Sequence, residues 1–65
     1  MISPLASVDS TAKIGKNVTI QPFAYIEGDV EIGDDCVIMS NASILKGTRL
    51  GKGNKVHHGA VLGSE

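Results

Sequence analysis

The stretch VTIQPFAYIEGDVEIGDDCVI, residues 18–38, carries an isoleucine at every sixth position. The same spacing runs through the whole chain, and all eleven positions are Ile, Leu or Val: Ile2, Val8, Ile14, Ile20, Ile26, Ile32, Ile38, Ile44, Leu50, Val56 and Leu62. A period of six fits neither an amphipathic helix, whose apolar residues recur about every 3.6 positions, nor a simple alternating strand. It is typical of a hexapeptide repeat that coils into a parallel β-helix.

A second register of mostly small residues precedes each aliphatic by two positions. Its members are Ala6, Ala12, Val18, Ala24, Val30, Cys36, Ala42, Thr48, Asn54 and Ala60. Side chains two apart in an extended segment point to the same side, so each hexad sends one large and one small residue inward. A unit this short cannot bury its apolar side alone and must stack on its neighbours.

A longer period of eighteen shows how the hexads are grouped. Gly15, Gly33 and Gly51 are eighteen residues apart, and Pro4 and Pro22 share that step. Three hexads therefore form one coil, and 65 residues make about 3.6 coils. The aliphatics fall into three columns: Ile2, Ile20, Ile38 and Val56; Val8, Ile26, Ile44 and Leu62; and Ile14, Ile32 and Leu50. The glycines are expected at a corner, where positive φ or close backbone approach favours them.

The outward residues predict three unlike faces. Charges of alternating sign surround the third column, at Lys13, Lys16, Glu31, Asp34, Asp35, Arg49 and Lys52, which indicates a solvated face. The other two faces present apolar residues at Phe23, Tyr25, Val37, Met39, Leu45 and Val61. Exposed apolar clusters usually mark interfaces, and a three-sided prism suits a cyclic oligomer, so we expect a homotrimer.

Composition argues against several classes of protein. The net charge is −1 and the basic residues are interleaved with acidic ones, which disfavours nucleic-acid binding. No apolar run approaches the ~18 residues of a membrane span. The first residues lack the basic and apolar regions of a signal peptide. The single cysteine, Cys36, excludes an internal disulfide and fits a reducing compartment, so a cytoplasmic location is expected.

Two adjacent histidines are the main candidates for chemistry. His57 should point outward from a strand and His58 should lie near a bend. Neighbouring side chains diverge, so they do not easily share a metal ion, and the separated histidines of a metal-dependent carbonic anhydrase are lacking. A structural or interface role is favoured over a substrate-lining role, and both over a role as general base.

The other polar candidates have structural interpretations. Cys36 lies on the inward column and is expected to be a buried thiol. Asn54 lies on the same column, where its amide must find backbone partners at a turn. The segment Gly51–Lys55 lacks the spacing of a phosphate loop, and Asp34–Asp35 is expected to be a turn pair. We therefore predict no catalytic, cofactor-binding or metal-binding residue in this chain, and no cofactor.

Particular segments narrow the repeat to a family. Met1–Ile2, Ile20-Gln21-Pro22-Phe23, Val30-Glu31-Ile32-Gly33 and Gly59-Ala60-Val61-Leu62-Gly63 together resemble the start of the bacterial UDP-N-acetylglucosamine 3-O-acyltransferases of lipid A biosynthesis. Gln21 stands where that family often has glycine. The resemblance covers essentially the whole chain but only about the first quarter of such an enzyme. Residues 1–65 are therefore expected to be the N-terminal coils of a longer β-helix domain.

The resemblance implies an all-β, left-handed parallel β-helix and a homotrimer. It also implies transfer of an (R)-3-hydroxyacyl group from acyl carrier protein to the 3-hydroxyl of UDP-N-acetylglucosamine, with a histidine as general base. That histidine and the sugar-contacting residues are expected beyond Glu65, so this piece supplies scaffold coils and is inactive alone. Alternatives are the related UDP-3-O-acylglucosamine N-acyltransferase and a hexapeptide-repeat protein with a structural or assembly role.

Overall fold

Each hexad from Ser7 onward forms one strand of two residues, followed by a turn. The structure is a computed structural model that describes residues 1–63. The strands are β1 (Ser7–Val8), β2 (Lys13–Ile14), β3 (Thr19–Ile20), β4 (Tyr25–Ile26), β5 (Glu31–Ile32), β6 (Val37–Ile38), β7 (Ser43–Ile44), β8 (Arg49–Leu50), β9 (Lys55–Val56) and β10 (Val61–Leu62). The second residue of each strand is the aliphatic of the sixfold pattern, and Ile2 adds an isolated bridge to Ile20.

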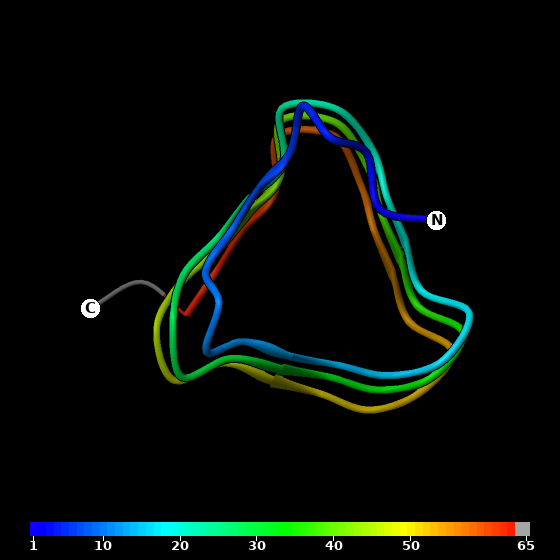
Figure 1. Cartoon of the computed structure of the whole chain (residues 1–65), viewed down its shortest axis with the longest axis vertical. Helices are drawn as coiled ribbons and strands as arrows, with labels where there is room; N and C mark the ends of the chain where they lie inside the picture. The colour runs from blue at the N-terminus through cyan, green and yellow to red at the C-terminus, as the bar shows by residue number, and fades with distance from the viewer. Residues whose placement is uncertain (64–65) are drawn as a thin grey trace.

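The strands stack into three parallel sheets, one on each side of a triangle (Figure 1). Sheet 1 contains β1, β4, β7 and β10, sheet 2 contains β2, β5 and β8, and sheet 3 contains β3, β6 and β9. Partners are eighteen residues apart, as in Ile14↔Ile32 and Ile32↔Leu50. The three aliphatic columns and the all-β prediction are therefore confirmed.

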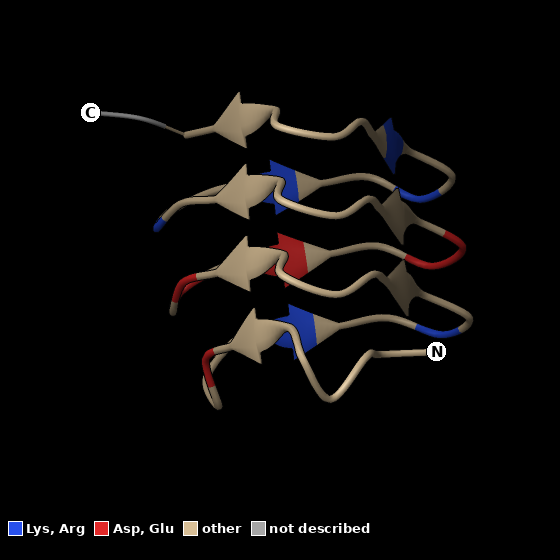
Figure 2. Ribbon diagram, turned by 90° about the horizontal axis from the view of Figure 1, so that it is seen from above, with Lys and Arg blue, Asp and Glu red and all other residues tan. Residues whose placement is uncertain are grey.

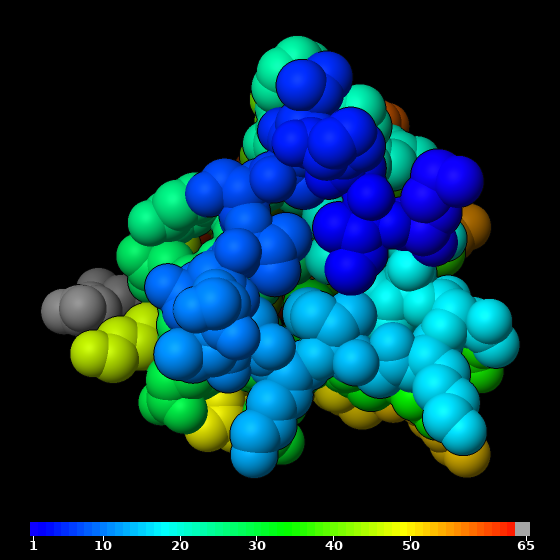
Figure 3. All heavy atoms as spheres, in the orientation of Figure 1, coloured from blue at the N-terminus to red at the C-terminus, as the bar shows by residue number. Residues whose placement is uncertain are grey.

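The coil is left-handed. In Figure 1 the chain runs anticlockwise, from the N-terminus at the right over the upper corner to the left side and then along the bottom. Figure 3 shows, in the same orientation, that the N-terminal residues lie nearest to the viewer. An anticlockwise path that recedes from the viewer is a left-handed helix. Parallel crossovers are right-handed in nearly all proteins, so this handedness sets the fold apart.

Backbone hydrogen bonds join each coil to the next. The N–H of Lys13 donates to the carbonyl of Val30 at 2.8 Å, and that of Glu31 donates to the carbonyl of Thr48 at 3.0 Å. The Met1 ammonium group closes the lower end by donating to the Val18 carbonyl at 2.8 Å. Every coil therefore depends on a neighbour for its backbone bonds.

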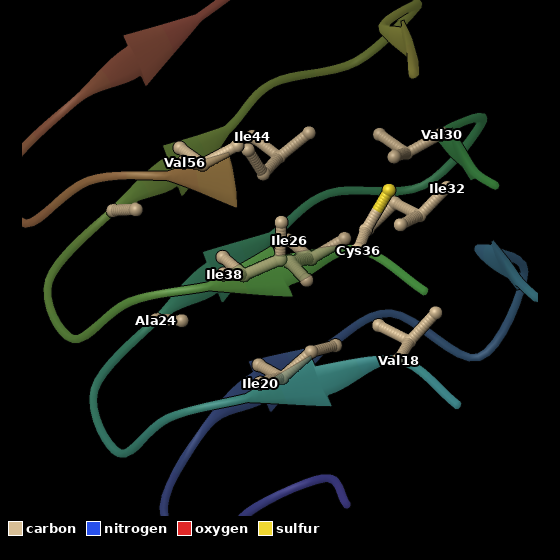
Figure 4. Close-up of a cluster of buried hydrophobic side chains, with 11 residues drawn as sticks. Val18, Ile20, Ala24, Ile26, Val30, Ile32, Cys36, Ile38, Ile44 and Val56 are labelled. Carbon is tan, nitrogen blue, oxygen red and sulfur yellow. The ribbon is translucent and has the colours of Figure 1, made fainter. Parts of the chain in front are cut away.

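The core is the stack of inward side chains (Figure 4). Its buried members are Val18, Ile20, Ala24, Ile26, Val30, Ile32, Cys36, Ile38, Ala42, Ile44 and Val56. Both inward registers are represented, as predicted. Ile2 belongs to the same column but is 45% exposed, because no coil lies beneath it in the structure. Asn54 is exposed too, which corrects the expectation of a buried amide, but its Nδ2 does donate to the Gly51 carbonyl at 2.9 Å.

The glycines serve two different purposes, close backbone approach and positive φ. A Cβ on Gly33 would lie 2.7 Å from the Gly51 carbonyl carbon, so only glycine allows the backbones to approach this closely. Positive φ occurs at Gly63 and, in the turns, at the third residue after the aliphatic. The residues are Asn17, Phe23, Asp29, Asp35, Asn41, Gly47, Gly53 and Gly59. Of the glycines at 15, 33 and 51, Gly15 and Gly33 show the expected close approach, whereas a Cβ on Gly51 would meet no atom closer than 3.8 Å.

Sheet 2 carries the charged face. Its outward residues Lys13, Glu31 and Arg49 stand directly above one another (Figure 2). Arg49 lies 3.6 Å from Glu31, and it also pairs at 2.8 Å with Asp29, a contact that the spacing did not predict. Asp34, in the turn after β5, joins two coils, because its Oδ1 accepts the Lys16 backbone N–H at 2.7 Å.

Among residues 1–63 there is no helix of the length and hydropathy that crossing a membrane requires.

Candidate functional site

A concavity lies on sheet 1, where the strands enter the turns toward sheet 2. It has a volume of about 470 Å³ and is open to solvent. Its lining residues are Ser7, Val8, Asp9, Tyr25, Ile26, Glu27, Gly28 and Lys46. They come from β1, β4 and the turns that follow β1, β4 and β7, so three successive coils contribute. Its surface combines two carboxylates, two hydroxyls and an ammonium group with the apolar side chains of Val8 and Ile26.

Glu27 is fixed by two hydrogen bonds in this concavity. Its Oε1 accepts the backbone N–H of Lys46, one coil above, at 2.8 Å. Its Oε2 accepts the Tyr25 hydroxyl at 3.1 Å. This hydrogen bond and the charge of Glu27 raise the pKa of Tyr25. The phenol is therefore a weaker acid than usual, and the carboxylate ties two coils together.

The carboxylate of Asp9 accepts hydrogen bonds from Thr11 within its own turn. Its Oδ1 accepts the Thr11 hydroxyl at 2.7 Å and the Thr11 backbone N–H at 2.8 Å. These bonds, the hydroxyl first, lower the pKa of Asp9. A carboxylate that is stabilised in its ionised form is a poor proton acceptor, so Asp9 is not suited to act as a general base.

The histidines lie away from this concavity, in the turn between β9 and β10. Both are exposed, as the sequence indicated. His58 Nδ1 lies 3.3 Å from the Ser40 carbonyl oxygen, which is the single ring contact of the pair among residues 1–63. No carboxylate orients either ring within that range. The arrangement thus resembles a stacking contact between coils more than an acid–base pair.

The other candidates occupy structural positions. Cys36 is fully buried, and its Sγ contacts the Gly51 carbonyl oxygen at 3.1 Å. Asp34 and Asp35 form the turn between β5 and β6, and Asp35 has φ of 63°. Among residues 1–63, no group of three or more His, Cys, Asp and Glu side chains could hold a metal ion.

The sequence did not reveal side-chain clamps between coils. Gln21 Oε1 accepts the Ser40 backbone N–H at 3.0 Å, and Glu27 makes the equivalent bond to Lys46 one hexad later. In both cases the acceptor directly follows the aliphatic and the donor lies nineteen residues further on. An amide or carboxylate at that repeat position is the signal that could have indicated the clamps. Gln21, which departs from the glycine of the family pattern, is one of them.

The repeat geometry agrees with comparisons to known proteins. The family model described as bacterial transferase hexapeptide (six repeats) matches residues 11–42 and 29–64. The chain belongs to the bacterial transferase hexapeptide family. The overlapping matches cover nearly all of the hexads after the first coil, which agrees with the uninterrupted strand pattern from β2 to β10.

Named members of the hexapeptide family resemble the chain over almost its full length. It is 38% identical over 64 residues to the acyl-[acyl-carrier-protein]--UDP-N-acetylglucosamine O-acyltransferase of Brucella ovis, and equally to that of Brucella melitensis biotype 1. The match takes in 98% of this chain but 23% of each relative. The chain thus spans about a quarter of the length of these proteins.

Comparison with solved structures finds proteins of the same name. The UDP-N-acetylglucosamine acyltransferase from Campylobacter jejuni superposes with a TM-score of 0.96 at 34% identity, over 98% of this chain and 25% of that one. The Arabidopsis UDP-N-acetylglucosamine acyltransferase gives 0.92 at 33% identity, over 94% and 21%. The sequence comparison and the structural comparison therefore both find UDP-N-acetylglucosamine acyltransferases.

Proposed function

We propose that these residues are the N-terminal coils of an acyltransferase that moves an (R)-3-hydroxyacyl group from acyl carrier protein to the 3-hydroxyl of UDP-N-acetylglucosamine in lipid A biosynthesis. The observation that carries the proposal is the continuous match to the Campylobacter jejuni enzyme, at a TM-score of 0.96 and 34% identity. A whole-length match at this identity is more than a shared repeat would require, because unrelated hexads share only their inward positions.

In this proposal the chain contributes scaffold and not catalysis. The support is local: Asp9 and Glu27 are held by hydrogen bonds, and both histidines lie outside the concavity. The general base and the sugar-contacting residues belong to coils beyond Glu65. A cytoplasmic homotrimer that uses acyl carrier protein and the sugar nucleotide as substrates completes the proposal.

Exchanging a segment between two proteins tests the proposed acyltransferase function. Residues 1–63 replace the matched quarter of the Campylobacter jejuni enzyme, and acyl transfer to UDP-N-acetylglucosamine is measured with hydroxyacyl-loaded carrier protein. We expect a folded chimera with kcat/KM within about tenfold of the parent, a difference of about 1.4 kcal/mol in transition-state stabilisation. The 65-residue chain alone should show no transfer.

Two outcomes contradict the proposal. A chimera that folds and keeps its oligomeric state but transfers no acyl group means that these coils do not fit the enzyme, which favours a structural or assembly role. Transfer to the 2-amino group of a UDP-3-O-acylglucosamine in place of the 3-hydroxyl of UDP-N-acetylglucosamine indicates the N-acyltransferase alternative.

A further inference from the structure

The turn between β9 and β10, which joins sheet 3 to sheet 1, carries both histidines of the chain. His58 stands one coil above Ser40, and its Nδ1 lies 3.3 Å from the Ser40 carbonyl oxygen. A carbonyl oxygen accepts hydrogen bonds and never donates them, so this contact places the ring proton on Nδ1. The other ring nitrogen, Nε2, then carries a free lone pair, and it has no hydrogen-bond partner among residues 1–63.

This arrangement is the one that a metal-binding histidine usually has. Such a histidine donates its second ring N–H to a backbone carbonyl or a carboxylate, which fixes the tautomer and the orientation of the ring. Neutral imidazole is also the commonest protein ligand of metal ions. Within residues 1–63 of one chain, however, no group of three or more His, Cys, Asp and Glu side chains could hold a metal ion. Further ligands must therefore come from other copies of the chain.

The surroundings of His58 are open and uncharged. His58 is exposed, and a Cβ added to the neighbouring Gly59 would meet no atom within 4 Å. Four turns stack at this corner, which is uppermost in Figure 1, and none of them contains a charged residue. They are residues 3–6, 21–24, 39–42 and 57–60. Other copies can therefore approach His58 without like charges facing one another.

A cyclic homotrimer brings three copies of one residue together. If the sheets with apolar outward residues, sheets 1 and 3, face other copies, the corner that they share is the one nearest to the threefold axis. Copies related by that axis place identical residues at equal height around it. The neighbouring rings of His57 and His58 diverge within one chain. The three equivalent His58 rings of a trimer, in contrast, surround a single point on the axis.

We propose that the Nε2 atoms of three His58 residues, one from each copy, bind a divalent transition-metal ion such as Zn²⁺ on the threefold axis of the homotrimer. Three imidazole nitrogens at about 2.0–2.1 Å leave a tetrahedral zinc ion one further position, which water fills. The inference rests on the homotrimer of the proposed function and adds a site that is complete only when three copies are present. The ion joins the copies and is separate from acyl transfer.

The ratio of metal to protein is the first test. The 65-residue chain is prepared without an affinity tag, stripped of metal with a chelator and titrated with Zn²⁺ by isothermal titration calorimetry. We expect one Zn²⁺ for every three chains, because the ion lies on the symmetry axis. One Zn²⁺ for every chain would mean that each copy binds the ion by itself, which overturns the shared site.

The substitutions His58→Gln and His57→Gln form a matched pair. A glutamine at position 58 can still donate a hydrogen bond to the Ser40 carbonyl, but the imidazole is gone from all three copies. Its Zn²⁺ affinity should therefore fall at least about 100-fold, the most that loss of an outer-shell partner alone commonly causes. His57→Gln should bind Zn²⁺ as tightly as the parent. Both histidines are exposed, so neither substitution should change the unfolding midpoint measured with chelator.

Metal binding and assembly are linked, which provides a second readout. If the trimer alone binds the ion, free Zn²⁺ at 100 times its dissociation constant raises the trimer association constant about 100-fold. Sedimentation equilibrium with Zn²⁺ and with chelator measures this change, which should be absent in His58→Gln. The same measurement on the chimera with the Campylobacter jejuni enzyme tests the turn within a longer β-helix.

The outcomes distinguish this inference from the proposed function. A trimer that binds no Zn²⁺, or that binds it equally well after His58→Gln, overturns the metal site and leaves the homotrimer standing. A chain and a chimera that both stay monomeric at all concentrations, with and without Zn²⁺, overturn both the site and the homotrimer. Acyl transfer by the chimera is measured with chelator present and bears on the reaction alone.

Discussion

At the scale of single residues, small differences in repeat position have distinct physical consequences. Gly33 directly follows an inward aliphatic and packs against the backbone of the coil above, whereas Gly53 has φ of 75° and open space around its α-carbon. Phe23 shares the turn position of Gly53 but has a large side chain. The same residue type therefore has different roles at different places in the hexad, and unlike residues adopt the same conformation.

The substitution Gly33→Ala tests whether the close approach of the Gly33 backbone to the next coil requires glycine. The added methyl would lie 2.7 Å from both the Gly51 carbonyl carbon and the Lys52 nitrogen, so two coils must separate. We expect a loss of about 1–3 kcal/mol in the free energy of unfolding, measured with denaturant. Gly51→Ala is the matched control, since its nearest neighbour would be the Asn54 Nδ2 at 3.8 Å. Equal losses at both sites would contradict this explanation.

Asp9 provides a prediction about pH. Its pKa in the folded chain lies below the ordinary 3.8, because Thr11 hydrogen-bonds the ionised form. The stabilisation is therefore present above the ordinary value and is lost as pH falls through the lowered one. Replacing Thr11 by valine keeps the backbone donor and removes the hydroxyl, so the Asp9 pKa should rise in an NMR titration of its carboxyl carbon. An unchanged pKa would show that the hydroxyl is not the cause.

At the scale of strands, two residues per strand suffice because each strand is one step of a longer ladder. β5 on its own has a single inward residue, Ile32, but it packs between Ile14 and Leu50 of the neighbouring coils. Each sheet is therefore stabilised by contacts between stacked side chains of successive coils rather than by contacts within one strand.

The substitution Ile32→Asp tests whether the stacked aliphatic side chains of sheet 2 stabilise the fold. Ile32 is 3% exposed, and a carboxylate there would be buried between two aliphatics without a partner, so we expect loss of the folded coils in circular dichroism. Lys52→Asp, on the exposed turn beside the same sheet, should change stability by less than about 0.5 kcal/mol. Comparable loss at both positions would mean that the inward and outward assignment is wrong.

At the scale of the whole molecule, the stack is a one-dimensional array. Each coil contacts only the coils above and below it, so total stability is close to a sum over neighbouring pairs. The upper edges of β8, β9 and β10 have no partner strand among residues 1–63, and Leu50 and Leu62 are only half-buried. The uppermost coil is therefore less protected than the core around Ile38.

Adding coils should stabilise the array. If the coil that follows the matched segment of the Campylobacter jejuni enzyme is joined after Gly63, it covers Leu50 and Leu62 and pairs their strands. We expect the unfolding midpoint to rise by roughly 4–8 °C for each kcal/mol gained. Inserting one extra residue at the junction turns the inward positions outward and should abolish the gain. A gain that survives this insertion would show that the added chain acts without forming a continuous coil.

The architecture was predictable from the sequence, and much of the surface was not. Ile32, Cys36 and Ala42 were placed inward correctly because a strict period forces the backbone to repeat. The Arg49–Asp29 pair and the Glu27–Lys46 clamp were missed because they depend on side-chain conformations across neighbouring coils.

The amino-acid sequence by itself determined the coil of eighteen residues, the three aliphatic columns and the segregation of charge. These follow from spacing, and spacing needs no knowledge of distant contacts. Only the tertiary structure decided that Phe23 is held at positive φ, that Gly33 is required for close approach, and that Glu27 and Asp9 are bound rather than free. The Asp9 bonds form within one turn. The Gly33 approach and the bond between Glu27 and Lys46 depend on how one coil packs on the next, and that contact exists only in the folded chain.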